Sequence, residues 1–111
     1  MDIVFKNNKL KKVFCSEQGL LTAYGSENAK KIQNRMVILR AARNLAEVPI
    51  VPPLHRHQLK GQYKGFFAVD VKQPFRLIFR PANEPVPKLE DGGIDLKAVT
   101  QIEIITVEDY H

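Results

Sequence analysis

Two sets of side chains in this sequence have the chemistry to move protons or to hold a phosphate group. The candidates for proton transfer are His57, Asp109, Tyr110 and His111. The cations that could bind phosphate are Arg56, Lys60, Arg76 and Arg80. Cleavage of RNA by its own 2′-hydroxyl needs a base for the hydroxyl proton, positive charge for the transition state and an acid for the leaving 5′-oxygen. Histidine titrates near neutral pH and suits both proton roles, while tyrosine can stack on an exposed base.

Each of these side chains also has an ordinary structural role open to it. A histidine at a chain end is usually solvated, and one that precedes a Leu-Lys-Gly turn, as His57 does, is often structural. Arg76 and Arg80 alternate with apolar residues, so they could simply lie on the solvated face of a strand. Residue types alone therefore make these side chains candidates for a site without establishing one.

Metal and cofactor chemistry has little support in the sequence. The three histidines stand at positions 55, 57 and 111, with no cysteine or carboxylate at ligand spacing. His55 and His57 could share one face of a strand and chelate an ion, but we expect no metal site. The sequence also lacks a glycine-rich phosphate loop and a Gly-x-Ser-x-Gly elbow, so no cofactor is predicted. Cys15 is expected to be a half-buried thiol in the first helix.

The composition predicts one soluble domain over residues 1–111. With 111 residues, 44% of them hydrophobic, the chain can build one globular core but not two. A lone cysteine allows no disulfide within the chain, so a reducing compartment, the cytoplasm, fits best. The N-terminus does not have the shape of a signal peptide, and the apolar runs are too short to span a membrane.

Positive charge is concentrated in the first part of the chain. Residues 1–80 hold 15 Lys and Arg against 5 Asp and Glu, a net charge of +10, whereas residues 81–111 hold 2 against 7, a net of −5. Clustered cations attract polyanions, so a phosphate-rich partner is expected. A solvated helix face, or basicity matched to an acidic protein partner, is the alternative explanation.

Two helices are predicted in the first half of the chain. Apolar residues recur at helical spacing in residues 8–17, after an asparagine that can cap a helix, and Gly19 is expected to end this helix. Residues 20–25 then form a connector. After Ser26, a second N-cap candidate, apolar residues recur every three or four positions, which predicts a longer helix over residues 27–46.

The strands are predicted mainly in the second half. They cover residues 3–5, 66–71, 75–80 and 101–107, with a further short strand and turn in residues 55–61. Residues 66–80 form a hairpin, because two β-rich segments flank a tight turn. Prolines keep residues 48–54 extended, and residues 81–100 form a long loop with a short helical turn near Leu96.

The resulting element order, β-α-α-β-β-β, predicts an α+β fold. In such a fold, two N-terminal helices pack on one face of a mostly antiparallel sheet, here of about four strands. No internal repeat or low-complexity tract suggests a different architecture.

Three segments that contain the candidate residues resemble the HigB-type plasmid-maintenance killer proteins, a branch of the RelE/ParE toxin superfamily. Residues 57–61 (HQLKG) are similar to the family's His-x-Leu-Lys-Gly. Residues 75–80 (FRLIFR) are similar to its aromatic-Arg-Ile-x-Phe strand, and residues 108–111 (EDYH) to its acidic-Asp-Tyr-His ending. The order and approximate spacing of the segments agree, and the similarity covers most of the chain.

The resemblance implies a RelE-like fold and the toxin of a type II toxin-antitoxin system. The implied activity is that of a ribosome-dependent mRNA endonuclease, an mRNA interferase. Its implied partners are mRNA on the ribosome and a helix-turn-helix antitoxin encoded beside it. Operator DNA would be bound only through the complex of toxin with antitoxin, and no membrane is involved.

The same resemblance assigns roles to individual residues. The implied catalytic group consists of His57, Asp109, Tyr110 and His111, together with Arg76. In that group Arg76 would contact the scissile phosphate, and Lys60 would assist it. Either His57 or His111 would transfer the proton. Tyr110 would stack or hydrogen-bond, and Asp109 would orient a neighbouring side chain.

The chain departs from the family pattern in two places, and other functions stay open. Pro74 stands where the family often has a polar residue, and residues 81–100 are longer than the usual hairpin turn. Acidic charge in that loop could restrict access to the ribosome or change the antitoxin contact. The alternatives are a ParE-like toxin that is no nuclease, or an inactive homologue that acts as a binding module in an antitoxin complex. ParE-like members generally lack the terminal Tyr and His. A third option is a DNA-binding partner, but no helix-turn-helix pattern is present.

Overall fold

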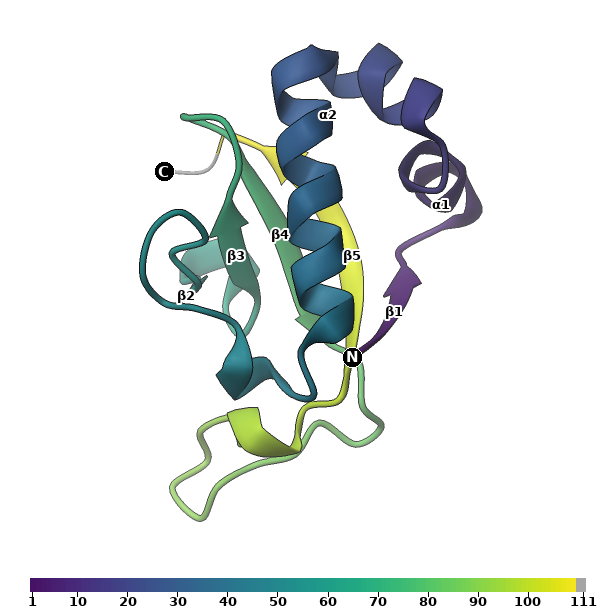
Figure 1. The fold of residues 1–111 in the computed structure, drawn as a ribbon. Helices are drawn as coiled ribbons and strands as arrows, with labels where there is room; N and C mark the ends of the chain where they lie inside the picture. The colour runs from purple at the N-terminus through teal and green to yellow at the C-terminus, as the bar shows by residue number, and fades with distance from the viewer. Residues whose placement is uncertain (110–111) are drawn as a thin grey trace.

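The computed structural model describes residues 1–109, and Tyr110 and His111 lie outside the described residues. Five strands form one sheet, and the long helix α2 (Glu17–Ala41) lies across one of its faces (Figure 1). The shorter helix α1 (Asn8–Phe14) packs against α2 and strand β1 (Asp2–Phe5) at the edge of the sheet. The predicted α+β fold, with helices on one face of a sheet, is confirmed.

The strand order in the sheet is β1-β5-β4-β3-β2. The strands are β1 (Asp2–Phe5), β2 (His57–Gln58), β3 (Phe67–Asp70), β4 (Arg76–Pro81) and β5 (Gln101–Glu108). Neighbouring strands are antiparallel except β1 and β5, which are parallel. The sheet has one strand more than the four expected. The additional strand is the two-residue β2, which lies in the segment predicted as a short strand and turn.

Each of the two helices begins at a side-chain cap. The side-chain oxygen of Asn7 accepts a hydrogen bond from the Leu10 N–H at 2.8 Å, and α1 covers Asn8–Phe14. The Ser16 hydroxyl accepts one from the Gly19 N–H at 2.9 Å, and α2 covers Glu17–Ala41. These caps satisfy backbone donors that have no partner within the first turn of a helix.

The prediction that Gly19 ends the first helix, and that residues 20–25 form a connector, is wrong. Because Ser16 caps α2, Gly19 lies in the first turn of that helix and residues 20–24 continue it up to Gly25. A Cβ on Gly19 would lie 2.8 Å from the carbonyl oxygen of Val13, so this glycine allows α1 and α2 to approach closely. Cys15, expected to be half-buried, is exposed at the end of α1.

The long helix has one interruption and ends earlier than predicted. Gly25 adopts φ 82° and ψ 166°, which breaks α2 just before the predicted start of the second helix. The predicted helix over residues 27–46 stops at Ala41. Leu45 is instead fully buried in a 3₁₀ turn (Leu45–Glu47), where its N–H donates to the Val99 carbonyl at 3.1 Å. Burial of Leu45 against the segment before β5 therefore replaces the last helical turn.

The sheet separates a large core from a small one. The large core lies between the sheet and α2 and includes Ile32, Leu39, Leu77, Phe79 and Ile104. In a small cluster, Ala68 and Ile78 alternate with the core residues of β3 and β4 and therefore lie on the other face of the sheet, where Leu59, just after β2, packs with them. We call this second face, which α2 does not cover, the outer face.

A β-bulge in β5 sets the direction of the last side chains of the strand. Ile78 pairs with Thr106 and Phe79 with Ile104, so Ile105 is an extra residue on β5. The extra residue reverses the alternation, which brings Glu108 opposite Arg76. Without the bulge, Glu108 would point to the α2 side of the sheet.

The long loop between β4 and β5 has more internal structure than the sequence predicts. Residues 82–100 contain an isolated bridge between Lys88 and Ile94, followed by a 3₁₀ turn at Leu96–Ala98 where a helical turn was expected. The Asn83 side chain accepts hydrogen bonds from the N–H groups of residues 100 and 101, which closes the loop at its base. This loop lies at the end of the sheet opposite to the end of β5 (Figure 1).

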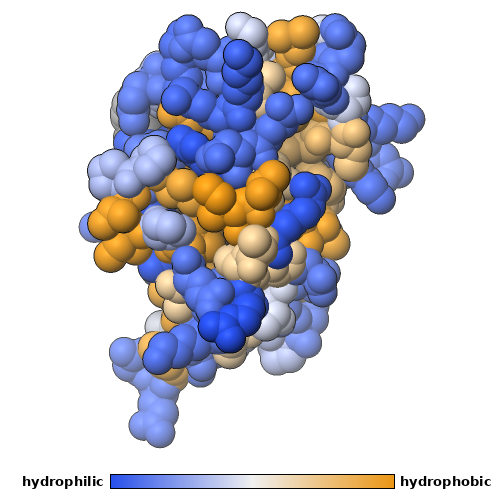
Figure 2. Space-filling model, in the orientation of Figure 1, coloured by the Kyte–Doolittle hydropathy of each residue, from blue (hydrophilic) through white to orange (hydrophobic). Residues whose placement is uncertain are grey.

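The face that carries α2 has an apolar surface of its own. Val37, Ile50 and Val51 are each about three-fifths exposed. Figure 2 shows hydrophobic side chains gathered in a band across the middle of this face, between hydrophilic regions. Among the described residues, no helix has the length and apolar character needed to cross a membrane.

Candidate active site

Several of the predicted site residues lie together on the outer face of the sheet. His57 on β2 pairs with Ala68 on β3, which pairs with Ile78 on β4. In the next row Asp70, Arg76 and Glu108 pair across β3, β4 and β5. Residues opposite each other in an antiparallel pair point to the same face. His57 and Arg76 therefore share the outer face, in neighbouring rows.

Arg76 is held at the start of β4 by a carboxylate. Its Nε atom lies 3.5 Å from Oδ1 of Asp70, and the two side chains are 21% and 12% exposed. Such low exposure reduces screening by water, so this ion pair restricts the guanidinium more than a surface pair would. A guanidinium has five N–H donors, so an ion pair through Nε does not exhaust its capacity to bind a phosphate.

The ring of His57 has a defined hydrogen bond. Its Nδ1 atom lies 2.8 Å from the backbone carbonyl oxygen of His55, and a carbonyl can only accept. Nδ1 therefore carries a proton, and in the neutral ring the lone pair lies on Nε2. This tautomer would allow Nε2 to accept a proton from a substrate hydroxyl.

Asp70 links the histidines to Arg76. While its Oδ1 faces Arg76, its Oδ2 lies 3.4 Å from Nδ1 of His55 and 3.3 Å from the side-chain nitrogen of Gln73. The rings of His55 and His57 pack with their centroids 5.2 Å apart. The outer face at this end of β3 thus holds a connected group of His55, His57, Asp70 and Arg76.

The remaining implied catalytic residues lie at the ends of the neighbouring segments. Lys60 is exposed just before a 3₁₀ turn (Gly61–Tyr63) that connects β2 to β3, in the same segment as His57. Asp109 is exposed directly after β5, next in sequence to Glu108 opposite Arg76. The two other predicted residues, Tyr110 and His111, lie outside the described residues.

Arg80 and Arg56 are not brought to this group. Arg80 lies four residues farther along β4, and its Nε atom is 2.6 Å from Oε1 of Glu103. Arg56 turns toward the turn after α2, where its Nη1 donates to the Leu45 carbonyl at 3.2 Å. Burial lowers the pKa of the Arg56 guanidinium. Both arginines therefore contact the protein itself at positions away from the connected group.

Sequence analysis considered His55 only as a possible metal ligand beside His57, and it missed Asp70. Asp70 is nearly buried at the end of β3 although it is charged, and such a position usually requires a partner. The alternation of residues 67–71 could have indicated that Asp70 faces away from the valines on either side of it. Its nearness to His55 could not be predicted, because it depends on how residues 49–56 fold back onto β3.

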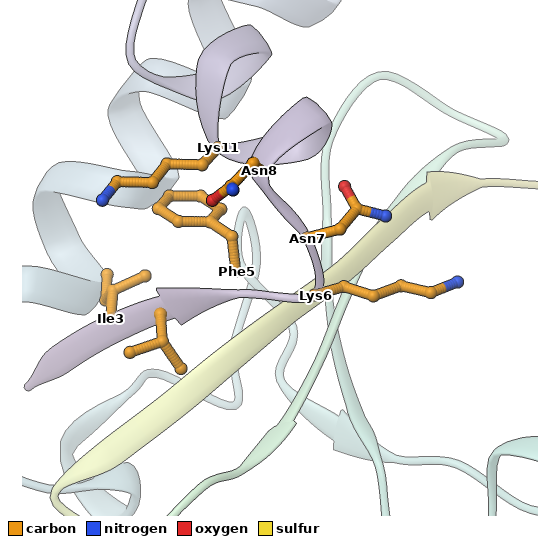
Figure 3. A pocket seen from close by; sticks show the side chains of 7 residues that line it. Ile3, Phe5, Lys6, Asn7, Asn8 and Lys11 are labelled. Carbon is orange, nitrogen blue, oxygen red and sulfur yellow. The ribbon is translucent and has the colours of Figure 1, made fainter.

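Two concavities formed by the described residues do not include the connected group. One of about 530 Å³ lies along β1 and the start of α1, at the edge of the sheet opposite β2. Figure 3 shows that Lys6 and Lys11 point to opposite sides of it, so their charges do not converge. Its lining holds lysines and asparagines but no histidine or carboxylate, and therefore no acid–base pair. A second, of about 480 Å³, lies between the kink of α2 and the turn before β4.

Comparison with known proteins identifies the family. The family of RelE-like toxins of the type II toxin-antitoxin system HigB matches residues 3–90, which include β1 to β4 and both helices. The chain belongs to this family. The resemblance predicted from the three sequence segments is therefore confirmed, and this HigB-like toxin belongs to the RelE/ParE superfamily. No curated protein matches the chain.

Solved structures of related toxins share the fold. A YoeB/ParE toxin from Agrobacterium tumefaciens is 12% identical, with all of both chains covered and a TM-score of 0.58. YafQ from E. coli is 14% identical over 97% of this chain and 91% of its own, with a TM-score of 0.59. The YoeB-YefM complex from Staphylococcus aureus is 13% identical over 100% and 97%, with a TM-score of 0.57. At these identities the likeness shows the RelE-like fold of the HigB-like toxin.

Proposed function

We propose that this toxin cleaves mRNA on the ribosome by attack of a 2′-hydroxyl on the adjacent phosphate. The observation that supports it most directly is the shared outer face of His57 and Arg76, with the end of β5 beside them. That face presents a proton acceptor and a cation without a covering helix. RNA cleavage of this kind requires both, and it requires no metal or cofactor.

In the proposed reaction the residues divide the work between base, cation and acid. His57 or His111 takes the proton of the 2′-hydroxyl, and the other is available to protonate the leaving 5′-oxygen. Arg76 stabilises the charge that develops on the phosphate, and Lys60 assists it. Tyr110 stacks on or hydrogen-bonds to a base, while Asp109 orients a neighbouring side chain. The bulge at Ile105 supports this assignment, because it brings Glu108, the residue that precedes Asp109, opposite Arg76.

We also propose that a helix-turn-helix antitoxin encoded beside this toxin neutralises it in the cytoplasm. One structural relative is a toxin in complex with its partner, YoeB with YefM. The net charge of +5 suits both an acidic protein partner and RNA. Operator DNA is then contacted through the complex, since the toxin itself has no helix-turn-helix pattern.

The test is induction of the wild type and of two single variants in bacteria, with mRNA 5′ ends mapped by primer extension. Wild type should give new 5′ ends within translated regions, whereas Arg76→Ala and His111→Ala should each lower the cleavage rate by roughly 10²-fold or more. Arg40→Ala, an exposed arginine on α2, is the matched control and should cleave as wild type does.

Three results would contradict the proposal. If wild type and His111→Ala arrest translation equally, the terminal histidine has no catalytic role. Growth arrest with intact mRNA and damaged DNA would instead support a ParE-like toxin that poisons a topoisomerase. Absence of any arrest in the wild type would indicate an inactive homologue.

A further inference from the structure

We propose that His55, His57 and Asp70 bind one divalent transition-metal ion, Zn²⁺ or Cu²⁺, on the outer face. One ligand atom from each of these three residues lies within 4.8 Å of the others. The three come from two separate segments, the loop that leads into β2 and the end of β3. The sequence offered only the two histidines, and the carboxylate is added by the fold.

The spacing of the group is close to that of a coordination sphere. Around a tetrahedral zinc ion with bonds of about 2.1 Å, neighbouring ligand atoms are roughly 3.4 Å apart. Nδ1 of His55 and Oδ2 of Asp70 are already 3.4 Å apart. The ligand atom of His57 lies within 4.8 Å of the other two, so the His57 side chain has to move closer for all three to reach one ion.

The hydrogen bond of His57 is the kind that accompanies metal ligation. A histidine ligand usually donates its second ring N–H to a carbonyl or a carboxylate, which fixes the ring and its tautomer. Nδ1 of His57 has such a carbonyl partner in the His55 backbone, at 2.8 Å. Nε2 is thereby left as the ligand atom.

The loop that carries His55 is fixed in place. His55 is the non-glycine residue with positive φ among those described, at 52°, a left-handed conformation that histidine adopts more readily than most residues. Its N–H donates to the Val51 carbonyl at 2.9 Å, and the Arg56 N–H donates to Pro49 at 3.0 Å. The Asp70 N–H in turn donates to Leu54 at 2.8 Å. Ligands from both segments are therefore preorganised relative to each other.

The carboxylate is oriented so that one oxygen faces the histidines. Gln73 contacts Oδ2 at 3.3 Å and Arg76 contacts Oδ1 at 3.5 Å, so Asp70 would act as a monodentate ligand. Arg76 also adds positive charge near the ion, which weakens binding. Two imidazoles and one carboxylate nevertheless match the ligand preferences of Zn²⁺ and Cu²⁺ rather than of Mg²⁺ or Ca²⁺. The side chain of His55 is 55% exposed, so water can complete the sphere.

A bound ion would occupy the lone pair that the proposed nuclease mechanism requires. Coordination of Nε2 prevents His57 from accepting a proton, so the metal should inhibit cleavage reversibly. This consequence rests on the proposed function, but the binding itself does not. The two can therefore be measured separately.

The experiment is calorimetric titration of the chelator-treated full chain with Zn²⁺, and electron paramagnetic resonance with Cu²⁺. Wild type should bind one ion per chain and show nitrogen coupling to Cu²⁺. His55→Asn keeps the preference for the left-handed backbone and should bind at least about tenfold more weakly, since even loss of an outer-shell partner costs that much. Asp70→Asn should weaken binding similarly, with folding checked by circular dichroism.

A matched control distinguishes this site from others. Glu90→Gln removes an exposed carboxylate in the loop between β4 and β5, so this variant should bind as wild type does. Absence of binding to wild type, or binding to His55→Asn and Asp70→Asn as tight as to wild type, would overturn the proposal. If the toxin binds the ion but cleaves no RNA, the metal site is supported and the proposed nuclease activity is refuted.

Discussion

Nε of Arg76 lies 3.5 Å from Oδ1 of Asp70, its direct partner across the β3–β4 pair, where both side chains are largely shielded from water. The same carboxylate reaches His55 with its other oxygen. Asp70 thus holds the cation proposed to contact the scissile phosphate, and it connects that cation to the histidines. Its position between them makes Asp70 the residue on which the geometry of the outer face depends.

Asp70→Asn should therefore impair cleavage through Arg76 without unfolding the toxin. An amide keeps the shape of the side chain but loses the charge that restrains the guanidinium. Misplacement of a positioned group lowers rates by roughly 10- to 100-fold. We expect this loss in the cleavage rate at saturating ribosomes, with little change in the ribosome concentration that gives half the maximal rate.

A purely structural role of Asp70 predicts a different pattern. In that case the substitution would lower the amount of folded toxin. The apparent loss of activity would then disappear once activity is normalised to the folded fraction. Asp70→Glu restores the charge and should recover part of the rate. Equal rates for the Asn, Glu and wild-type forms would show that Asp70 does not position Arg76.

The two outward arginines of β4 should differ sharply in their effect on cleavage. Arg76→Ala removes the cation beside His57 and should cost roughly 10²–10³-fold in rate. Arg80 lies about 13 Å farther along the strand and pairs with Glu103 at 2.6 Å, so Arg80→Ala should reduce the rate far less. This ion pair is only partly exposed, and it should contribute roughly 1 kcal/mol to stability. If Arg80→Ala lowers the cleavage rate as much as Arg76→Ala does, RNA must contact β4 along its whole length.

Arg76 and Arg80 illustrate which features of the site can be predicted from the sequence and which cannot. The alternation of residues 75–80 correctly predicted that Arg76 and Arg80 lie on the same face of a strand. It could not predict their partners, because Asp70 and Glu103 come from two different neighbouring strands. Register is set by the tertiary fold, and the bulge at Ile105 that brings Glu108 beside Arg76 has no local signal.

The boundaries of the helices could also be predicted only in part. Asparagine and serine caps are recognisable in the sequence, but Gly19 indicates a helix end as readily as Ser16 indicates a helix start. The role of Gly19 is to allow close contact with Val13. Likewise the last turn of the helix predicted to reach residue 46 is lost to the burial of Leu45, a tertiary effect that outweighs local propensity.

Removal of the last three residues should separate activity from folding. β5 ends at Glu108, and Asp109 is exposed, so deletion of residues 109–111 removes no residue of the described core. The free energy of unfolding in urea should therefore change by no more than about 0.5 kcal/mol. Cleavage should be lost, because the tail supplies three of the proposed catalytic residues. A truncated toxin that still cleaves would move the active site away from the C-terminus.

Gly25→Ala should destabilise the toxin through its backbone alone. Gly25 interrupts α2 with φ 82° and ψ 166°, a region of conformational space that is essentially restricted to glycine. A Cβ built at this position has no atom within 4 Å, so no steric clash would add to the cost. We expect a loss of about 1–3 kcal/mol in the free energy of unfolding, measured by urea denaturation. Lys31→Ala, at an exposed position of the same helix, should change it by less than about 0.5 kcal/mol. An unchanged stability in Gly25→Ala would mean that α2 can straighten at residue 25, and the approach of α1 to the sheet would then have to shift with it.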